Sequence, residues 1–128
     1  MEAPPEESEK PLASSAPSPE IHLPVVLDDA GDLTAHLSIS GARQYVEAID
    51  VEDGAYEAFD ATGRRLRVYV DGEVVRMVPA NGAEPDEDEL RRRLISFFER
   101  LSRTRPEWGV ASDASLQHLV DRLLTLQA

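Results

Sequence analysis

The chain has 128 residues and a formal net charge of −12, from 25 acidic and 13 basic side chains, and it contains no cysteine. This charge argues against a surface built to bind nucleic acid or an anionic membrane, because binding to phosphates needs an excess of Lys and Arg. The absence of cysteine excludes disulfides, thiolate nucleophiles and zinc sites of the cysteine type. We therefore expect a cytoplasmic protein whose fold is held together by packing alone.

Residues 1–20 differ in composition from the rest of the chain. They consist mainly of Pro, Glu, Ser and Ala, so ordering them would cost backbone entropy without burying apolar surface. The segment also lacks the apolar run of a secretory signal or a membrane anchor. We predict a disordered tail over residues 1–20 and a single domain over residues 21–128.

Two extended segments follow the tail. The run at 21–27 is predicted to be a strand, and Pro24 indicates an edge position, because proline has no N–H to donate to a neighbouring strand. After the turn sequence DDAGD, residues 33–39 alternate between apolar and polar, which is typical of a strand with one buried face. Its inward positions are Leu33, Ala35, Leu37 and Ile39. The two segments are expected to form a hairpin.

The apolar spacing then changes to a helical period. Apolar residues stand at i, i+3, i+4 and i+7, namely Ala42, Tyr45, Val46 and Ile49. Ser40 is placed to cap the helix, and Gly54 can take the positive φ that ends it. We predict a short helix whose Tyr45, Val46 and Ile49 face the core.

A meander of three strands is expected next. The strands are predicted at 55–60, 65–70 and 73–78. Asp71 and Gly72 form a strong signal for a two-residue hairpin loop, and this loop would place Arg67 opposite Arg76. Two arginines in these positions would repel each other.

The preceding turn offers a remedy for this repulsion. A three-residue loop with Gly63 in the left-handed conformation pairs Glu57 with Arg67, and the same register agrees with the apolar alternation. The predicted core face carries Tyr56, Ala58, Leu66, Val68, Val75 and Met77. The opposite face carries Glu57, Phe59, Arg65, Arg67, Tyr69, Val74, Arg76 and Val78.

Two helices are predicted at the C-terminal end. The first spans roughly 85–103, with one apolar stripe and i, i+4 pairs that join Glu87 to Arg91, Asp88 to Arg92 and Glu89 to Arg93. The stripe consists of Leu90, Leu94, Phe97, Phe98 and Leu101. The second helix follows a cap at Ser112 or Asp113. The expected fold is α+β, in the order ββαβββαα, with an antiparallel sheet of about five strands packed on these two helices.

No motif in the sequence identifies a reaction. The acidic turn that starts at Asp50 does not match a calcium-binding EF-hand loop, because Gly54 stands where that loop has a ligand and Ala55 where it has glycine. No serine stands in a nucleophile elbow, no phosphate-binding glycine loop is present, and the histidines lack the spacing of a helical metal pair. We therefore expect no catalytic residue, no metal and no cofactor.

Two surfaces are candidates for binding a partner. The first is acidic, because Arg43 is the only Lys or Arg between Asp28 and Asp60, and its candidate binding residues are Glu47, Asp50, Glu52 and Asp53. The second is the outer sheet face, which combines aromatic and arginine side chains as protein interfaces do: Phe59, Arg67, Tyr69 and Arg76.

The leading hypothesis is a small, non-enzymatic protein-binding module whose acidic surface docks on a basic protein. Immunity proteins and antitoxins inhibit nuclease toxins in this manner, so an inhibitor of a basic protein is one form of the hypothesis. Two alternatives stay open. One is a metal-dependent or carboxylate-using enzyme domain built on Asp50, Glu52, Asp53 and a histidine. The other is an oligomerising structural domain, in which the last helix or the outer sheet face meets its own copy.

Overall fold

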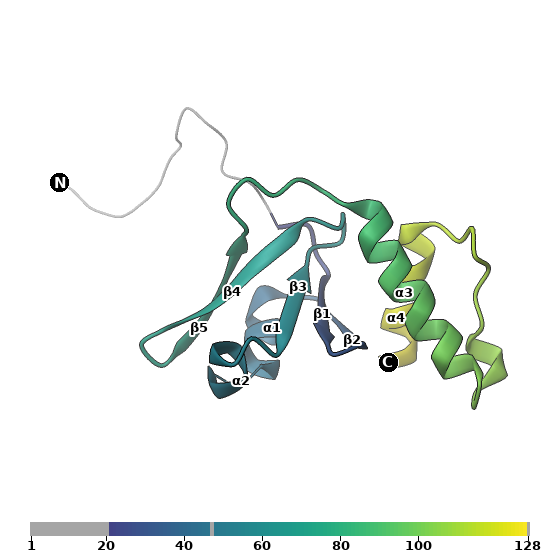
Figure 1. The fold of residues 1–128 in the computed structure, drawn as a ribbon, viewed down its shortest axis with the longest axis horizontal. Coiled ribbons are helices and arrows are strands. Elements are labelled where there is room, and N and C mark those ends of the chain that lie inside the picture. The colour runs from purple at the N-terminus through teal and green to yellow at the C-terminus, as the bar shows by residue number, and fades with distance from the viewer. Residues whose placement is uncertain (1–20, 47, 128) are drawn as a thin grey trace.

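The computed structural model describes residues 21–46 and 48–127, and these form an α+β fold around one sheet (Figure 1). The five antiparallel strands have the order β2-β1-β3-β4-β5. They are β1 Val25–Asp29, β2 Asp32–His36, β3 Tyr56–Phe59, β4 Arg65–Asp71 and β5 Val74–Pro79. The helices are α1 Ile39–Tyr45, α2 Ala48–Glu52, α3 Glu87–Ser102 and α4 Leu116–Gln127, with a 3-10 turn, η1, at Pro106–Trp108. The predicted α+β class and element order are confirmed, and the predicted tail at 1–20 lies outside the described residues.

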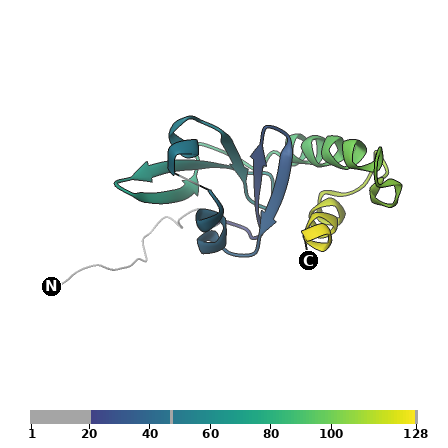
Figure 2. The ribbon, with the colours of Figure 1, turned by 90° about the horizontal axis from the view of Figure 1, so that it is seen from below.

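Helices cover both faces of the sheet. On one face, α1 and α2 pack over a core formed by Val25, Leu27, Ala42, Val46, Ala58, Leu66, Val75 and Met77. On the other face, α3 and α4 pack over the sheet residues Val26, Leu33, Ala35 and Phe59. In both ribbon views the β4–β5 hairpin reaches away from the α3–α4 pair (Figures 1 and 2). The second helix pair therefore covers only the half of its face that contains β1, β2 and β3.

The strand β1 lies inside the sheet, between β2 and β3, so the predicted edge position is wrong. Pro24 stands immediately before the first residue of β1 and does not interrupt a ladder of hydrogen bonds. The turn to β2 has positive φ at both Ala30 and Gly31, as a two-residue type I′ hairpin loop requires. The edges of the sheet are β2 and β5.

The helix that follows β2 begins two residues earlier than the sequence indicated. Ser38, not Ser40, is the cap, and its hydroxyl accepts a 2.9 Å hydrogen bond from the N–H of Gly41. Leu37 therefore falls in a connection and is 72% exposed, contrary to its predicted inward position. Ala42 and Val46 are buried as predicted, whereas Tyr45 is half exposed, because α1 ends there and Val46 is already extended. The side chain of Ile49 is not among those that the structure describes.

The turn between β3 and β4 has the predicted three-residue loop. Ala58 pairs with Leu66 and Phe59 with Arg65, which is the register expected from Glu57 opposite Arg67, and Gly63 has a φ of 87°. The fully buried carboxylate of Asp60 organises this loop. It accepts hydrogen bonds from the backbone N–H groups of His22, Thr62 and Arg64 and from the hydroxyl of Thr62.

The turn between β4 and β5 lies one residue later than predicted, which shifts the pairing of the two strands by two residues. Asp71 pairs with Val74, so Gly72 and Glu73 form the loop. Gly72 has a φ of 67° and Glu73 does not have a positive φ, which fits a type II′ turn with glycine first. Because side chains alternate with a period of two, this shift keeps every predicted face but changes the partners. Arg76 lies opposite Tyr69 instead of Arg67, and the predicted repulsion between the two arginines does not arise.

The two C-terminal helices bury the predicted apolar stripes. Leu90, Leu94 and Phe98 of α3 are fully buried, and Asp86 caps the helix by accepting from the N–H of Glu89 at 3.2 Å. In α4 the buried residues are Leu116, Leu119, Val120 and Leu123. Its cap is Ser115, whose hydroxyl accepts from the N–H of His118 at 3.1 Å, and not Ser112 or Asp113 as predicted.

Candidate functional site

A group of charged residues joins α3 to the middle of the sheet. Asp28 on β1 and Glu57 on β3 lie directly opposite each other, on the face that α3 covers. Arg93 reaches both, with its Nη1 at 2.7 Å from Asp28 and 2.5 Å from Glu57, while its Nε lies 2.7 Å from Glu89. The guanidinium of Arg93 also lies 5.0 Å from the centre of the buried Phe59 ring. We call Asp28, Glu57, Glu89 and Arg93 the charged seam.

The pKa values of the seam reflect these contacts. Burial by itself would lower the pKa of Arg93, but its hydrogen bonds with Glu57, Glu89 and Asp28 outweigh burial and raise that pKa above its ordinary value. Hydrogen bonds from Arg93 and then Arg65 lower the pKa of Glu57. Hydrogen bonds from Arg92 and Arg93 lower the pKa of Glu89 to about 2. Glu57, Glu89 and Arg93 are thus held in their charged forms, which suits an ion-pair network better than acid–base catalysis at neutral pH.

The arginines of α3 have partners different from those expected. The predicted pair of Glu89 with Arg93 is present, but Arg92 also binds Glu89, at 2.6 Å, instead of Asp88. Arg91 donates to the carbonyl groups of Ser112 and Ala114 and not to Glu87. The helix therefore uses its basic residues to hold the sheet and the connection to α4.

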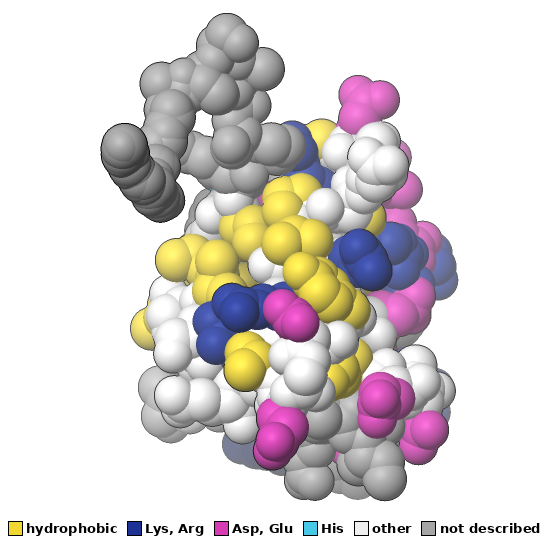
Figure 3. All heavy atoms as spheres, turned by 90° about the vertical axis from the view of Figure 1, so that its left-hand side faces the viewer, with side chains coloured by type: hydrophobic (Ala, Val, Ile, Leu, Met, Phe, Trp, Pro, Cys, Tyr) yellow, Lys and Arg dark blue, Asp and Glu magenta, His cyan; other side chains and the backbone are white. Residues whose placement is uncertain are grey.

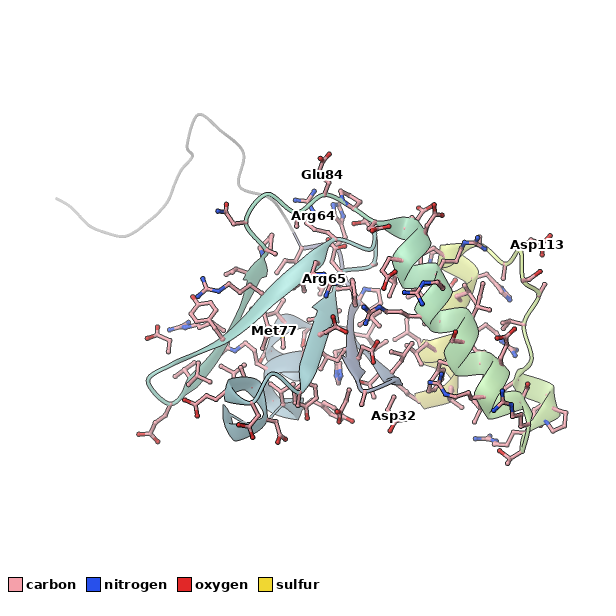
Figure 4. The ribbon with its side chains drawn as sticks, in the orientation of Figure 1. Asp32, Arg64, Arg65, Met77, Glu84 and Asp113 are labelled. Carbon is pink, nitrogen blue, oxygen red and sulfur yellow. The ribbon has the colours of Figure 1, made fainter. Side chains whose placement is uncertain are left out.

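Glu57 pairs with Arg65 at 2.7 Å and with Arg93, and it does not pair with Arg67 as predicted. Although the backbone register is the expected one, the guanidinium groups of Arg65 and Arg93 occupy the Glu57 carboxylate. Arg67 has no carboxylate partner among the described residues, and its guanidinium stacks on the Tyr69 ring at 4.4 Å. Arg65 lies at the boundary between the hairpin and α3 (Figure 4).

Beyond this boundary, the outer side of the β4–β5 hairpin is open. We call it the hairpin face, and it consists of Arg67, Tyr69, Val74, Arg76 and Val78. Val74 and Val78 are 40% and 37% exposed, which is unusual for aliphatic side chains in a strand. Arg76 is only loosely paired, at 3.6 Å from Asp71. Figure 3 looks at this end of the molecule and shows apolar side chains interspersed with basic ones.

Of the residues predicted for this surface, Phe59 lies elsewhere. Its side chain is only 1% exposed and belongs to the core beneath α3, between the guanidinium groups of Arg65 and Arg93. The structure thus brings Arg67, Tyr69 and Arg76 together on the hairpin face and separates Phe59 from them. Alternation along β3 placed Phe59 on the correct side of the sheet but could not show how far α3 extends.

The predicted acidic surface is smaller than the sequence indicated. Asp28 and Glu57 belong to the charged seam, and Asp60 is buried in its loop. At the end of α2, Glu52 and Asp53 are exposed and Asp50 is partly buried. None of these three forms an ion pair with another described residue. Glu47 lies outside the described residues.

The described part of the chain contains no group of three or more His, Cys, Asp and Glu side chains that could hold a metal ion.

His36 is packed against the Tyr45 ring, with ring centres 4.9 Å apart, and its Nε2 lies 3.0 Å from the Thr34 hydroxyl. Burial lowers the pKa of His36. Over the described residues, no helix combines the length and apolar character needed to cross a membrane.

No family model, curated protein or solved structure matches this chain.

Proposed function

We propose that this protein is a non-enzymatic protein-binding module that docks its partner on the hairpin face. The observation that carries this proposal is the uncovered outer side of β4 and β5, which presents two exposed valines, a tyrosine and two arginines side by side. The centres of protein interfaces are enriched in Tyr and Arg, and exposed aliphatic groups gain most when a partner removes them from water. The ordered sheet below the face would present these groups with little loss of conformational entropy on binding.

The arrangement of the face also supports a specific, oriented contact. Arg67 lies opposite Val78, and Tyr69 lies opposite Arg76, so basic and apolar groups alternate across the two strands. The Arg67 guanidinium lies over the Tyr69 ring and has no carboxylate partner among the described residues, so its N–H groups are available for a planar acceptor such as a carboxylate.

A second candidate is the binding of a basic protein at the end of α2, as an inhibitor of the immunity type would do. It is favoured by Asp50, Glu52 and Asp53, which have no basic partner among the described residues, and by the net charge of −12. Such charges mainly accelerate association, and their effect weakens with salt.

Capture from host lysate on an immobilised chain, followed by identification of the retained proteins, tests both surfaces. Val78→Glu should abolish retention if the partner binds the hairpin face, because it replaces one of the two exposed valines by a carboxylate directly opposite Arg67. Leu37→Glu is the control, since Leu37 is an aliphatic residue even more exposed than Val78 and lies on the connection between β2 and α1, outside the hairpin face. Equal loss in both variants, or no loss in either, would contradict docking on the hairpin face. Loss only after reversal of Glu52 and Asp53 to Lys would favour the acidic end of α2.

A further inference from the structure

We propose that β5 accepts an extended acidic segment of the partner as a sixth strand of the sheet. This inference rests on the proposed function and names the manner of binding and the chemistry of the partner.

The backbone of β5 has free hydrogen-bonding groups along its outer edge. The N–H of Ala80 donates to the carbonyl of Arg65 at 3.0 Å, which fixes the alternation of hydrogen bonds between β5 and β4. Every second residue counted back from Ala80 bonds β4. Val75 and Met77 lie between these residues, so their N–H and C=O groups point away from β4. Among the described residues no further strand lies beside them. They can therefore pair with a strand supplied from outside.

The opposite edge of the sheet is capped at Ala35, and β5 has no such cap among the described residues. The side-chain amide of Gln127 in α4 accepts from the N–H of Ala35 and donates to its C=O, both at 2.7 Å. The amide thereby occupies the place of a neighbouring strand at the middle of β2. No described side chain does the same for Val75 or Met77 of β5.

The side chains beside the open edge determine which segment fits. On the hairpin face, an added strand would lie next to Val74, Arg76 and Val78 in turn. An apolar, acidic, apolar order at alternate positions would match them, because cross-strand pairs of opposite charge and of aliphatic groups stabilise a sheet. Arg67, one strand further in, lies within reach of the same carboxylate through its free guanidinium.

The inner side of the edge supports the same chemistry. A hollow of about 380 Å³ lies there between α1 and the start of β5, and its wall contains Arg43, Val46 and Val75, together with the acidic residue Glu73 at the hairpin turn. The Nε of Arg43 is buried and has no hydrogen-bond partner. A side chain from an added strand would enter this hollow, so an acid or an amide at that position would satisfy Arg43.

A second copy of this chain fits the edge less well than an acidic segment does. In a symmetric pairing centred on Arg76, this residue would face its own copy, and like charges in directly opposite positions destabilise a sheet. Each copy also carries a net charge of −12. The overall charge repels an acidic segment too, but at physiological salt the Debye length is about 8 Å, so the local arginines decide the short-range contact.

The test uses the full chain, labelled for NMR, and two synthetic peptides of about eight residues, a typical strand length. One peptide alternates Glu and Val, and the other alternates Lys and Val. We expect the Glu–Val peptide to slow hydrogen exchange of the Val75 and Met77 amides at least about tenfold, while the Lys–Val peptide leaves both unchanged.

Arg76→Glu should weaken binding of the Glu–Val peptide by about tenfold, as expected for loss of a charge-assisted contact. Arg105→Glu is the control, because it changes the net charge equally at η1, away from the edge, and should alter binding less than about twofold.

Equal binding of both peptides, no binding of the Glu–Val peptide, or equal effects of both variants would overturn the proposal. Slower amide exchange that grows with protein concentration in the absence of peptide would assign the edge to a second copy and overturn it as well. Peptide-induced changes at Tyr69 and Val78 without protection of Val75 and Met77 would refute strand addition and leave docking on the hairpin face intact.

Discussion

Asp28 and Glu57 occupy directly opposite positions on β1 and β3, which places two carboxylates face to face at the centre of the sheet. Arg93 of α3 binds both of them. The ion pairs that hold the helix on the sheet therefore also offset the repulsion between two carboxylates on neighbouring strands.

Replacing Arg93 tests this dependence. Arg93→Met keeps the length of the side chain but leaves the buried Asp28 without an ionic partner, opposite Glu57, which keeps only Arg65. We expect the free energy of unfolding to fall by about 2 to 3 kcal/mol, less than the roughly 3 to 5 kcal/mol for breaking a fully buried ion pair, because Glu57 is half exposed and keeps Arg65. Urea unfolding followed by circular dichroism measures this change. Arg92→Met is the control, since the exposed Arg92 contacts only Glu89 and its loss should cost less than about 1 kcal/mol.

The stability of the protein should fall at acidic pH because of the same residues. Hydrogen bonds from the arginines lower the pKa of Glu57, and that of Glu89 to about 2, from the ordinary value of 4.5. A lowered pKa in the folded state contributes stability above the unfolded pKa, and this contribution is lost as the pH falls towards the folded pKa. We expect stability to decline between about pH 4.5 and pH 2, and to decline less steeply in Arg93→Met. Parallel pH profiles of the two proteins would show that the seam does not cause the decline.

Asp60 should be as important for stability as an apolar core residue. Its carboxylate satisfies three backbone N–H groups and the Thr62 hydroxyl in the turn between β3 and β4. Asp60→Ala leaves these donors without their acceptor in a buried place, and we expect a loss of about 2 to 4 kcal/mol in thermal or urea unfolding. Asp71→Ala, at the exposed end of β4, should change stability by less than about 0.5 kcal/mol. Similar values for the two variants would contradict this role of Asp60.

The Gln127 amide makes a further prediction about the β2 edge. Gln127→Ala removes both hydrogen bonds to Ala35, and we expect the Ala35 amide to exchange with solvent about tenfold faster, with about 1 kcal/mol lost overall. Thr125→Ala serves as the control, because Thr125 bonds only the Asp121 carbonyl within its own helix. If exchange at Ala35 stayed as slow as in the unchanged protein, something other than the amide would have to protect this edge.

Local patterns predicted the elements and faces of this fold well. Alternation alone assigned Ala58, Leu66, Val75 and Met77 to the core, and Gly63 fixed the register of the first turn in the meander. The shift of the second turn changes the strand pairing by two residues and leaves each side chain on the same face of the sheet. Apolar alternation therefore does not reveal it. Turn chemistry also favoured Asp71-Gly72 as the loop, whereas the chain uses Gly72 and Glu73.

Long-range contacts could not be predicted in the same way. An i, i+4 pattern gave Arg91, Arg92 and Arg93 partners within their own helix, so nothing in the sequence indicated that Arg93 reaches Asp28, 65 residues away in the chain. The same limit explains Phe59, whose covering by α3 depends on where the helix crosses the sheet. The hairpin face could be proposed because it depends on neighbouring strands, but its boundary with α3 could not.

Gly63 also couples the hairpin mechanically to α3. Its carbonyl accepts from the N–H of Asp86 at 3.1 Å, Arg64 forms a bridge with Pro85, and a Cβ on Gly63 would lie only 2.7 Å from the carbonyl carbon of Asp86. The turn where β4 begins and the start of α3 are thus joined at one point by direct backbone contact. A force that displaces the β4–β5 hairpin at this turn therefore acts directly on the backbone at the start of α3.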